Sequence, residues 1–329
     1  MQRVDKCLEN LVLRARRQRL ALRSLRKGLE LRRITPAARS DGAAVFACIR
    51  DEALRLPDFL DHYRRLGAAQ FYIADNGSTD GSAALLAAQP DVSLWAARGS
   101  YRRARFGMDW LGALKRRHGC GRWCLTVDAD ELLIYPDWET RPLPALCAWL
   151  DARGLRSLPA LLLDLHGGPG AAGPGGRILD QLPWFDSASY RAQRDPRYGH
   201  DWIQGGPRER AFFAADPRAA PALNKVPLVR WKPGQAYVSS THHLLPRGLN
   251  LRREEAPTGV LLHTKLLPGL SGRAAREAER GEHYRGGAEY RAYLQGGGTA
   301  VALHHPGSRR FSGWRQLEAL GLMSRGLWA

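Results

Sequence analysis

The sequence lacks several features that would settle its class at once. It contains no apolar run of about 18 residues, the length that a membrane-spanning helix requires. Its first residues have neither the apolar centre nor the small-residue cleavage site of a secretory signal, so none is expected. Only five cysteines occur, mostly within apolar segments. An odd number of such cysteines favours reduced thiols and a cytoplasmic protein over a disulfide framework.

Acidic residues and lysine are scarce relative to arginine. The chain of 329 residues has 50 Lys and Arg against 32 Asp and Glu, a formal net charge of +18, and only six of the basic residues are Lys. A strongly basic chain can attract nucleic acid, an anionic membrane or a phosphate-bearing substrate. Heavy use of Arg, Ala and Gly is also typical of a GC-rich genome, so the charge by itself selects none of these partners.

The first forty residues form a unit of their own in the sequence. Residues 1–34 contain eleven Lys or Arg against three acids, with leucines at loosely helical spacing. This pattern predicts a basic amphipathic helix, followed by a linker up to residue 40. Such a helix suits the inner face of the cytoplasmic membrane, where the protein would bind peripherally. The same pattern fits a solvated helix packed on the main domain, and both interpretations stay open.

Strands and helices are predicted to alternate from residue 43 onward. Apolar, partly β-branched segments predict strands at 43–49, 70–74, 92–95 and 123–127, and amphipathic segments predict helices at 57–66, 83–88 and 107–118. Short links between alternating elements indicate an α/β fold, a mostly parallel sheet with helices on both faces. Ligands of such sheets bind at the carboxyl ends of the strands.

The strand at 123–127 ends in three acids, Asp128, Asp130 and Glu131. Burying one carboxylate without a partner is costly, and adjacent carboxylates repel each other. A divalent cation would relieve both problems, and oxygen ligands suit Mg²⁺ or Mn²⁺. Two protein carboxylates would leave coordination positions for phosphates. The alternative is a solvated acidic turn after a core strand.

Two further polar clusters follow predicted strands. Arg50-Asp51-Glu52 comes after the first strand, and the turn 75–82 comes after the second. Because the carboxyl ends of parallel strands meet at one edge of the sheet, the three clusters are expected to lie together. Their coincidence favours a ligand site over three unrelated turns.

These motifs, in this order, resemble the family 2 glycosyltransferases of GT-A fold. The match includes Arg-Asp-Glu, Asp-Asn-Gly-Ser-Thr-Asp-Gly and Val-Asp-Ala-Asp-Glu, and the sequence His-Tyr-Arg-x-Leu-Gly at 62–67 resembles a bacterial branch of the family. The resemblance is close over 43–136 and looser over 200–295. It implies a GT-A domain at 41–265 and a helical C-terminal extension at 266–329.

The resemblance implies transfer of a sugar from a nucleotide-sugar donor to a glycan or lipid-linked acceptor, with Mn²⁺ or Mg²⁺ as the cofactor. It also implies inversion of configuration at the anomeric carbon. The implied metal residues are Asp128, Asp130 and the late histidine His263. The implied nucleotide-binding residues are Arg50, Glu52, Asp75, Asn76, Ser78, Asp80 and Asp128. The Glu-Asp pair usual in the family is not visible, and Asp201 and Glu209 are the candidate catalytic bases.

Two other functions remain compatible with the sequence. The run Asp-Ala-Asp-Glu-Leu nearly matches the nucleophile loop of haloacid-dehalogenase-type phosphatases, with Asp128 as nucleophile. Its fifth position is Leu132 rather than Thr or Val, and that loop normally follows the first strand. The net charge would also suit a nucleic-acid-binding protein. No known nucleic-acid-binding motif occurs, so no nucleic-acid partner is expected.

Overall fold

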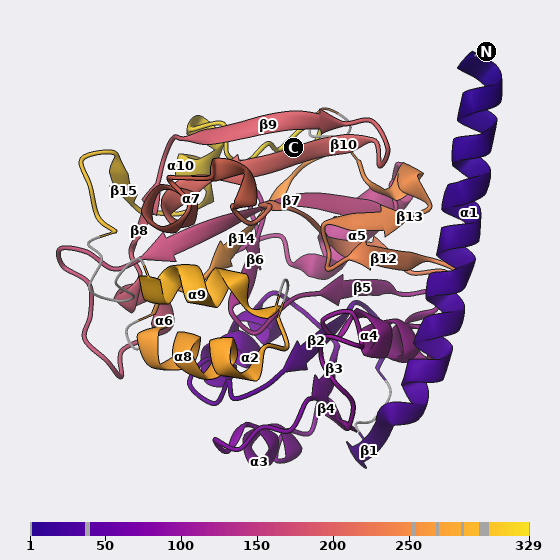
Figure 1. Cartoon of the computed structure of the whole chain (residues 1–329), viewed down its shortest axis with the longest axis horizontal. Coiled ribbons are helices and arrows are strands. Elements are labelled where there is room, and N and C mark those ends of the chain that lie inside the picture. The colour runs from indigo at the N-terminus through magenta and orange to yellow at the C-terminus, as the bar shows by residue number, and fades with distance from the viewer. Residues whose placement is uncertain are drawn as a thin grey trace.

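The computed structural model describes residues 2–36, 40–251, 254, 256–267, 270–283, 286–295 and 303–328 (Figure 1). The strands are β1 (Leu31–Thr35), β2 (Ala44–Ile49), β3 (Gln70–Asp75), β4 (Val92–Ala97), β5 (Trp123–Thr126), β6 (Glu131–Ile134), β7 (Ser157–His166), β8 (Trp184–Asp186), β9 (Tyr190–Asp195), β10 (His200–Gly205), β11 (Asn224–Arg230), β12 (Ala236–Ser239), β13 (His243–Leu245), β14 (Gly259–His263) and β15 (Ser308–Arg310). The helices are α1 (Gln2–Lys27), α2 (Leu56–Arg65), α3 (Ser82–Ala87), α4 (Met108–Leu114), α5 (Leu143–Ala152), α6 (Ile178–Gln181), α7 (Gly206–Phe212), α8 (Leu270–Arg280), α9 (Ala288–Gln295) and α10 (Trp314–Ala319).

A large mixed sheet organises the chain. Its strand order is β1-β4-β3-β2-β5-β11-β7-β14-β6, with β8 and β15 attached beside β7. Strands β4, β3, β2 and β5 are parallel neighbours, and β7 pairs in parallel with β14. The remaining pairings in this sheet are antiparallel. The predicted α/β class is therefore confirmed, with the parallel strands concentrated in the predicted N-terminal half.

Helices cover both faces of the parallel strands. Strand β2 is buried throughout, and its alternate side chains enter two different cores. Val45 packs in the core that contains Phe59 of α2, whereas Phe46 packs in the core that contains Trp110 of α4. This follows from the two-residue period of a strand, which sends successive side chains to opposite faces.

The N-terminal segment is attached to this sheet. Helix α1 lies along one side of the molecule (Figure 1), and Arg23 forms an ion pair of 2.7 Å with the fully buried Asp109 of α4. The prediction of helix up to residue 34 is wrong at its end: α1 stops at Lys27, a single 3-10 turn follows at Gly28–Glu30, and β1 then pairs with β4 as the edge strand of the sheet. A Cβ added at Gly28 would lie 2.9 Å from Ala113, so this close approach to α4 favours glycine.

The C-terminal extension also returns to the main domain. Residues 266–329 include α8, α9 and α10, in line with the predicted helices, together with the short strand β15. The buried Trp328 donates a hydrogen bond of 2.8 Å to the main-chain oxygen of Pro136. Within the part of the chain that the structure describes, no helix combines the length and apolar character needed to cross a bilayer.

Candidate functional site

A pocket of about 140 Å³ lies at the carboxyl ends of β2, β3 and β5. These strands are adjacent and parallel, so the residues that follow them reach the same edge of the sheet. Six residues predicted for the site line this pocket: Arg50, Glu52, Asn76, Asp128, Asp130 and His263. Nine lining residues were not predicted: Cys48, Ile49, Tyr101, Ala129, Lys265, Glu277, Arg280, His283 and Tyr290.

The acidic turn between β5 and β6 is enclosed rather than solvated. Glu131 is 2% exposed and forms an ion pair of 2.9 Å with Lys225, which is also buried. Burial and the neighbouring Glu131 carboxylate raise the pKa of Asp128 to about 7, against the opposing charge of Lys225. Asp128 is therefore poised to lose a proton when a cation approaches.

Asp130 belongs to a chain of paired charges. His263 lies with its Nε2 3.4 Å from Asp130 and its Nδ1 2.5 Å from Asp164. Burial opposes ionisation of Asp130, but the His263 imidazolium outweighs it and holds the pKa of Asp130 well below its usual range. Asp164 fixes the ring by accepting the Nδ1 proton, the arrangement by which carboxylates orient metal-binding histidines.

Sheet register explains why these groups meet. His263 belongs to β14, which lies between β6 and β7 in the sheet. It pairs with Glu131 of β6 on one side and with Asp164 of β7 on the other. Arg208 of α7 then closes the chain, donating from Nε to Asp164 at 2.7 Å. The charges at the pocket are thus compensated by residues that lie far apart in the sequence.

Three cations face the same pocket. Arg50 donates to the main-chain oxygen of Asn76 at 3.0 Å, and Arg280 of α8 donates to its side-chain oxygen at 2.7 Å. Lys265 forms an ion pair of 3.2 Å with Glu289. The pocket therefore combines donor groups for a divalent cation with cations that can hold phosphate oxygens.

The predicted nucleotide-binding set is divided by the structure. Asp75, Ser78 and Asp80 do not line the pocket, although Asn76 between them does. Asp75 accepts a hydrogen bond of 3.1 Å from the main-chain N–H of Ser78, and Asp80 accepts one of 2.9 Å from that of Ala53. These contacts hold the turn and the loop after β2 in place. The three side chains therefore support the site without lining it.

The two predicted catalytic bases lie outside this pocket. Asp201 of β10 is 3.9 Å from Arg194 and lines a separate hollow beside β11. Glu209 of α7 is paired with Arg191 of β9. Neither carboxylate is brought to the acidic turn.

Helix α8 and the residues after it cover the pocket. Glu277 and Arg280 stand three residues apart on α8, and His283 follows; all three face the pocket. Their charged, polar pattern in the sequence resembles an ordinary solvated helix face, which is why they were missed. A volume of about 140 Å³ is smaller than the roughly 300–1,000 Å³ of ordinary ligand sites.

Two residues of α2 hold β6, and with it the acidic turn, in place. His62 Nε2 lies 2.8 Å from the main-chain oxygen of Leu133, and the Tyr63 hydroxyl donates to that of Glu131 at 2.7 Å. The Tyr63 hydroxyl also accepts a hydrogen bond of 3.0 Å from the Leu133 N–H. The His-Tyr pair in the sequence is therefore a support for the site rather than part of its lining.

The buried His62 predicts a specific loss of stability in acid. Burial lowers the pKa of His62 to about 4, below the value of about 6.5 expected in the unfolded chain. Between pH 6.5 and pH 4 the unfolded state binds more protons than the folded state. The free energy of unfolding should therefore decline by about 3 kcal/mol as the pH falls from 6.5 to 4. Urea unfolding of wild type and His62→Gln across this range measures the difference.

The control is His304→Gln, which changes a partly exposed ring packed against Trp184. It should retain the acid-dependent loss of stability, whereas His62→Gln should reduce it. If wild type and His62→Gln decline equally between pH 6.5 and 4, His62 does not resist protonation in the folded protein.

Comparison of the sequence with models of known protein families and with curated proteins finds no match. The interpretation of the pocket therefore depends on its own chemistry. That chemistry is defined by Asp128, Asp130 and His263 together with the basic side chains that line the same pocket.

Proposed function

We propose that the protein is a metal-dependent glycosyltransferase of GT-A type that uses a nucleotide-sugar donor. The observation that carries this proposal is the composition of the pocket at the carboxyl ends of the parallel strands. It presents Asp128, Asp130 and His263 together with Arg50 and Lys265. Carboxylate and imidazole groups suit a divalent cation, and the basic side chains suit the diphosphate that such a cation accompanies.

Departure of a nucleoside diphosphate requires neutralisation of the charge that develops on its phosphates. Mn²⁺ or Mg²⁺ held by Asp130, Asp128 and His263 would supply that neutralisation when bound. Arg280 and Lys265 would hold the phosphate oxygens and exclude water from them. The acceptor proposed for this site is a glycan or a lipid-linked sugar.

Glu277 is the better placed candidate for the base that deprotonates the acceptor hydroxyl. It lines the pocket from α8, where it pairs with His283 at 2.8 Å, whereas Asp201 and Glu209 do not line the pocket. Glu277→Gln should leave donor binding unchanged but lower the turnover number by about 10²–10⁴-fold, the usual contribution of a general base. Isothermal titration and a nucleoside-diphosphate release assay separate the two effects, and unchanged turnover would exclude Glu277 as the base.

The metal assignment predicts a loss of nucleotide binding in Asp130→Asn. The substitution removes one charged oxygen ligand and the partner of His263, so Mn²⁺-dependent binding of UDP or GDP should weaken by about 10–100-fold. The fold should persist, because the hydrogen bond from Thr264 uses the main-chain oxygen of Asp130. Isothermal titration with and without Mn²⁺ measures the change.

Asp180→Asn provides the matched control, since Asp180 is exposed and lies outside the pocket. It should bind nucleotide as wild type does. The metal assignment fails if Asp130→Asn, folded by circular dichroism, keeps the wild-type affinity in Mn²⁺.

We also propose that α1 docks the enzyme on an anionic membrane surface, where a lipid-linked acceptor would lie. The face of α1 opposite the buried Leu13 presents a row of exposed apolar side chains: Leu8, Leu11, Val12, Leu22 and Leu25. Exposed Arg14, Arg19 and Arg26 flank this row. Exposed leucines beside basic residues are typical of helices that lie in a lipid interface.

This second proposal predicts that Leu11→Ser combined with Leu22→Ser weakens binding to anionic vesicles by about 10²–10⁴-fold, since each buried leucine contributes about 1.5–3 kcal/mol. Wild type should sediment with vesicles at low salt and be released as salt rises. Leu320→Ser, at another exposed leucine, is the control.

Equal sedimentation of the double variant and wild type would contradict docking through this face. Docking would also be contradicted if neither protein bound vesicles and the wild type were a dimer that the double variant converts to a monomer. The row of leucines would then serve self-association. Size-exclusion chromatography of both proteins distinguishes that case.

A further inference from the structure

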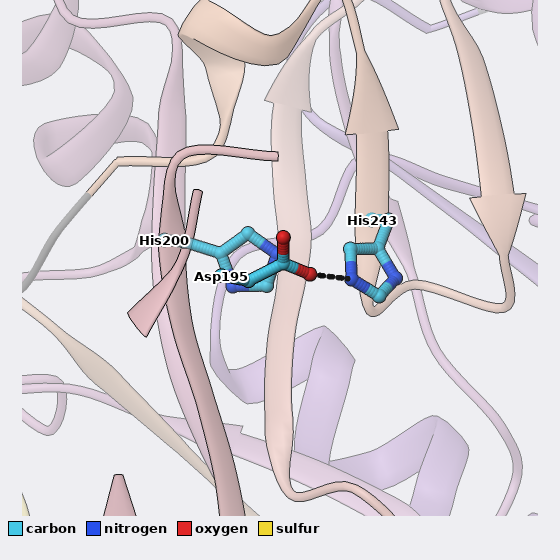
Figure 2. A group of neighbouring side chains, drawn as sticks. All are labelled: Asp195, His200 and His243. Carbon is cyan, nitrogen blue, oxygen red and sulfur yellow. Dashed lines mark hydrogen bonds and ion pairs between the residues drawn. The ribbon is translucent and has the colours of Figure 1, made fainter. Parts of the chain in front are cut away.

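A second cluster of metal-binding side chain types lies outside the pocket. Asp195 ends β9, His200 begins β10 and His243 begins β13, and one donor atom of each lies within 4.8 Å of those of the other two. No other group of three His, Cys, Asp or Glu residues within the described ranges meets this limit. Figure 2 shows the two imidazoles on either side of the Asp195 carboxylate.

One atom of this cluster lacks the partner that a buried polar atom normally has. His200 is 4% exposed, and its Nε2 has no hydrogen-bond partner. Its Nδ1 lies 3.0 Å from the main-chain oxygen of Asp201, which can only accept, so the proton belongs on Nδ1. The lone pair on Nε2 is then buried without a donor, which is costly unless a ligand binds it.

The amide of Asn224 lies near the same ring nitrogen, at a longer distance than the Asp201 oxygen. Its nitrogen is 3.3 Å from His200 Nδ1 but also donates to the main-chain oxygen of His242 at 3.2 Å. Its oxygen accepts from the Ile203 N–H at 3.2 Å, which fixes the orientation of the amide. The carbonyl of Asp201 therefore serves as the outer group that orients a metal-binding histidine.

The remaining contact has the spacing of two ligands on one ion. His243 Nε2 lies 3.2 Å from Asp195 Oδ2. Bonds of about 2.0–2.1 Å to a tetrahedral Zn²⁺ place neighbouring ligand atoms about 3.3 Å apart. His243 is also buried and packs against Trp202 in a nearly parallel stack.

We propose that Asp195, His200 and His243 bind a Zn²⁺ ion, with water completing the coordination. Two imidazoles and one carboxylate suit zinc better than Mg²⁺, which prefers oxygen ligands throughout. The site thus differs in chemistry from the acidic turn at the other pocket. A hollow of about 530 Å³ is lined by Arg194, Pro196 and Gly199, the chain neighbours of Asp195 and His200.

The proposed ion would join two hairpins beneath α1. Asp195 and His200 flank the turn of the β9–β10 hairpin, whereas His243 belongs to the β12–β13 hairpin. Tyr198 of that turn packs against His243 at 4.2 Å between ring centroids, and its hydroxyl accepts a hydrogen bond of 2.7 Å from Arg16 of α1. Zinc at this position would therefore stabilise the β9–β10 turn, which helix α1 contacts through Arg16.

The test uses the full chain carrying Asp130→Asn, so that zinc binding at the other pocket is weakened. After treatment with a chelator, this protein should take up Zn²⁺ and gain thermal stability in proportion to zinc concentration. Adding Asp195→Asn or His243→Gln should weaken zinc binding by at least about 10–100-fold. Co²⁺ in place of zinc should give the visible absorption of a tetrahedral site, and the same variants should abolish it.

Asp195→Asn keeps the turn intact, because Asp195 Oδ1 accepts the N–H groups of Arg197 and Tyr198 and an asparagine oxygen can do the same. It therefore decides the result if His243→Gln fails to fold. His304→Gln should leave zinc binding unchanged. The proposal is overturned if the chelator-treated protein takes up no zinc, or if it takes up zinc equally with and without Asp195→Asn.

Discussion

The structure depends on the compensation of three carboxylates gathered at the end of one strand. Glu131 is buried, whereas Asp128 and Asp130 are partly buried and line the pocket. Lys225 balances Glu131, and His263 balances Asp130. Removing either cation would leave a buried charge unpaired, which is among the most destabilising changes a fold can suffer.

This requirement accounts for the second half of the sheet. Lys225 comes from β11 and His263 from β14, strands that follow the acidic turn by more than ninety residues in the sequence. Their insertion between and beside β5, β7 and β6 converts a parallel N-terminal sheet into a mixed one. Asp164 in turn pairs with His263, and Arg208 pairs with Asp164. The C-terminal half is therefore part of the site as well as part of the fold.

The sequence predicted the N-terminal half because its information is local. Strands β2 to β5 carry continuous apolar runs, and short links between alternating elements leave a parallel sheet as the natural arrangement. Strand β6 was missed because only three apolar residues, Leu132 to Ile134, follow the acidic turn, too few to show a strand period. Strands β9, β10 and β13 are short or polar and are held by distant partners, which periodicity does not reveal.

The site was predicted to a similar extent. Asp128, Asp130 and Arg50 lie at the shared edge of the sheet, as expected from their positions after parallel strands. Asp75 and Asp80 share that position in the sequence but turn toward main-chain N–H groups, a choice that depends on loop geometry. Arg280 and Glu277 reach the pocket only because α8 folds back over it.

The most direct test of the proposed chemistry is release of nucleoside diphosphate from a panel of nucleotide-sugars. Wild-type protein with Mn²⁺ and a glycan or lipid-linked acceptor should release UDP or GDP from at least one donor, and a chelator should stop the release. Inorganic phosphate liberated from phosphate monoesters, with every nucleotide-sugar left intact, would contradict a glycosyltransferase and indicate Asp128 as a phosphatase nucleophile instead.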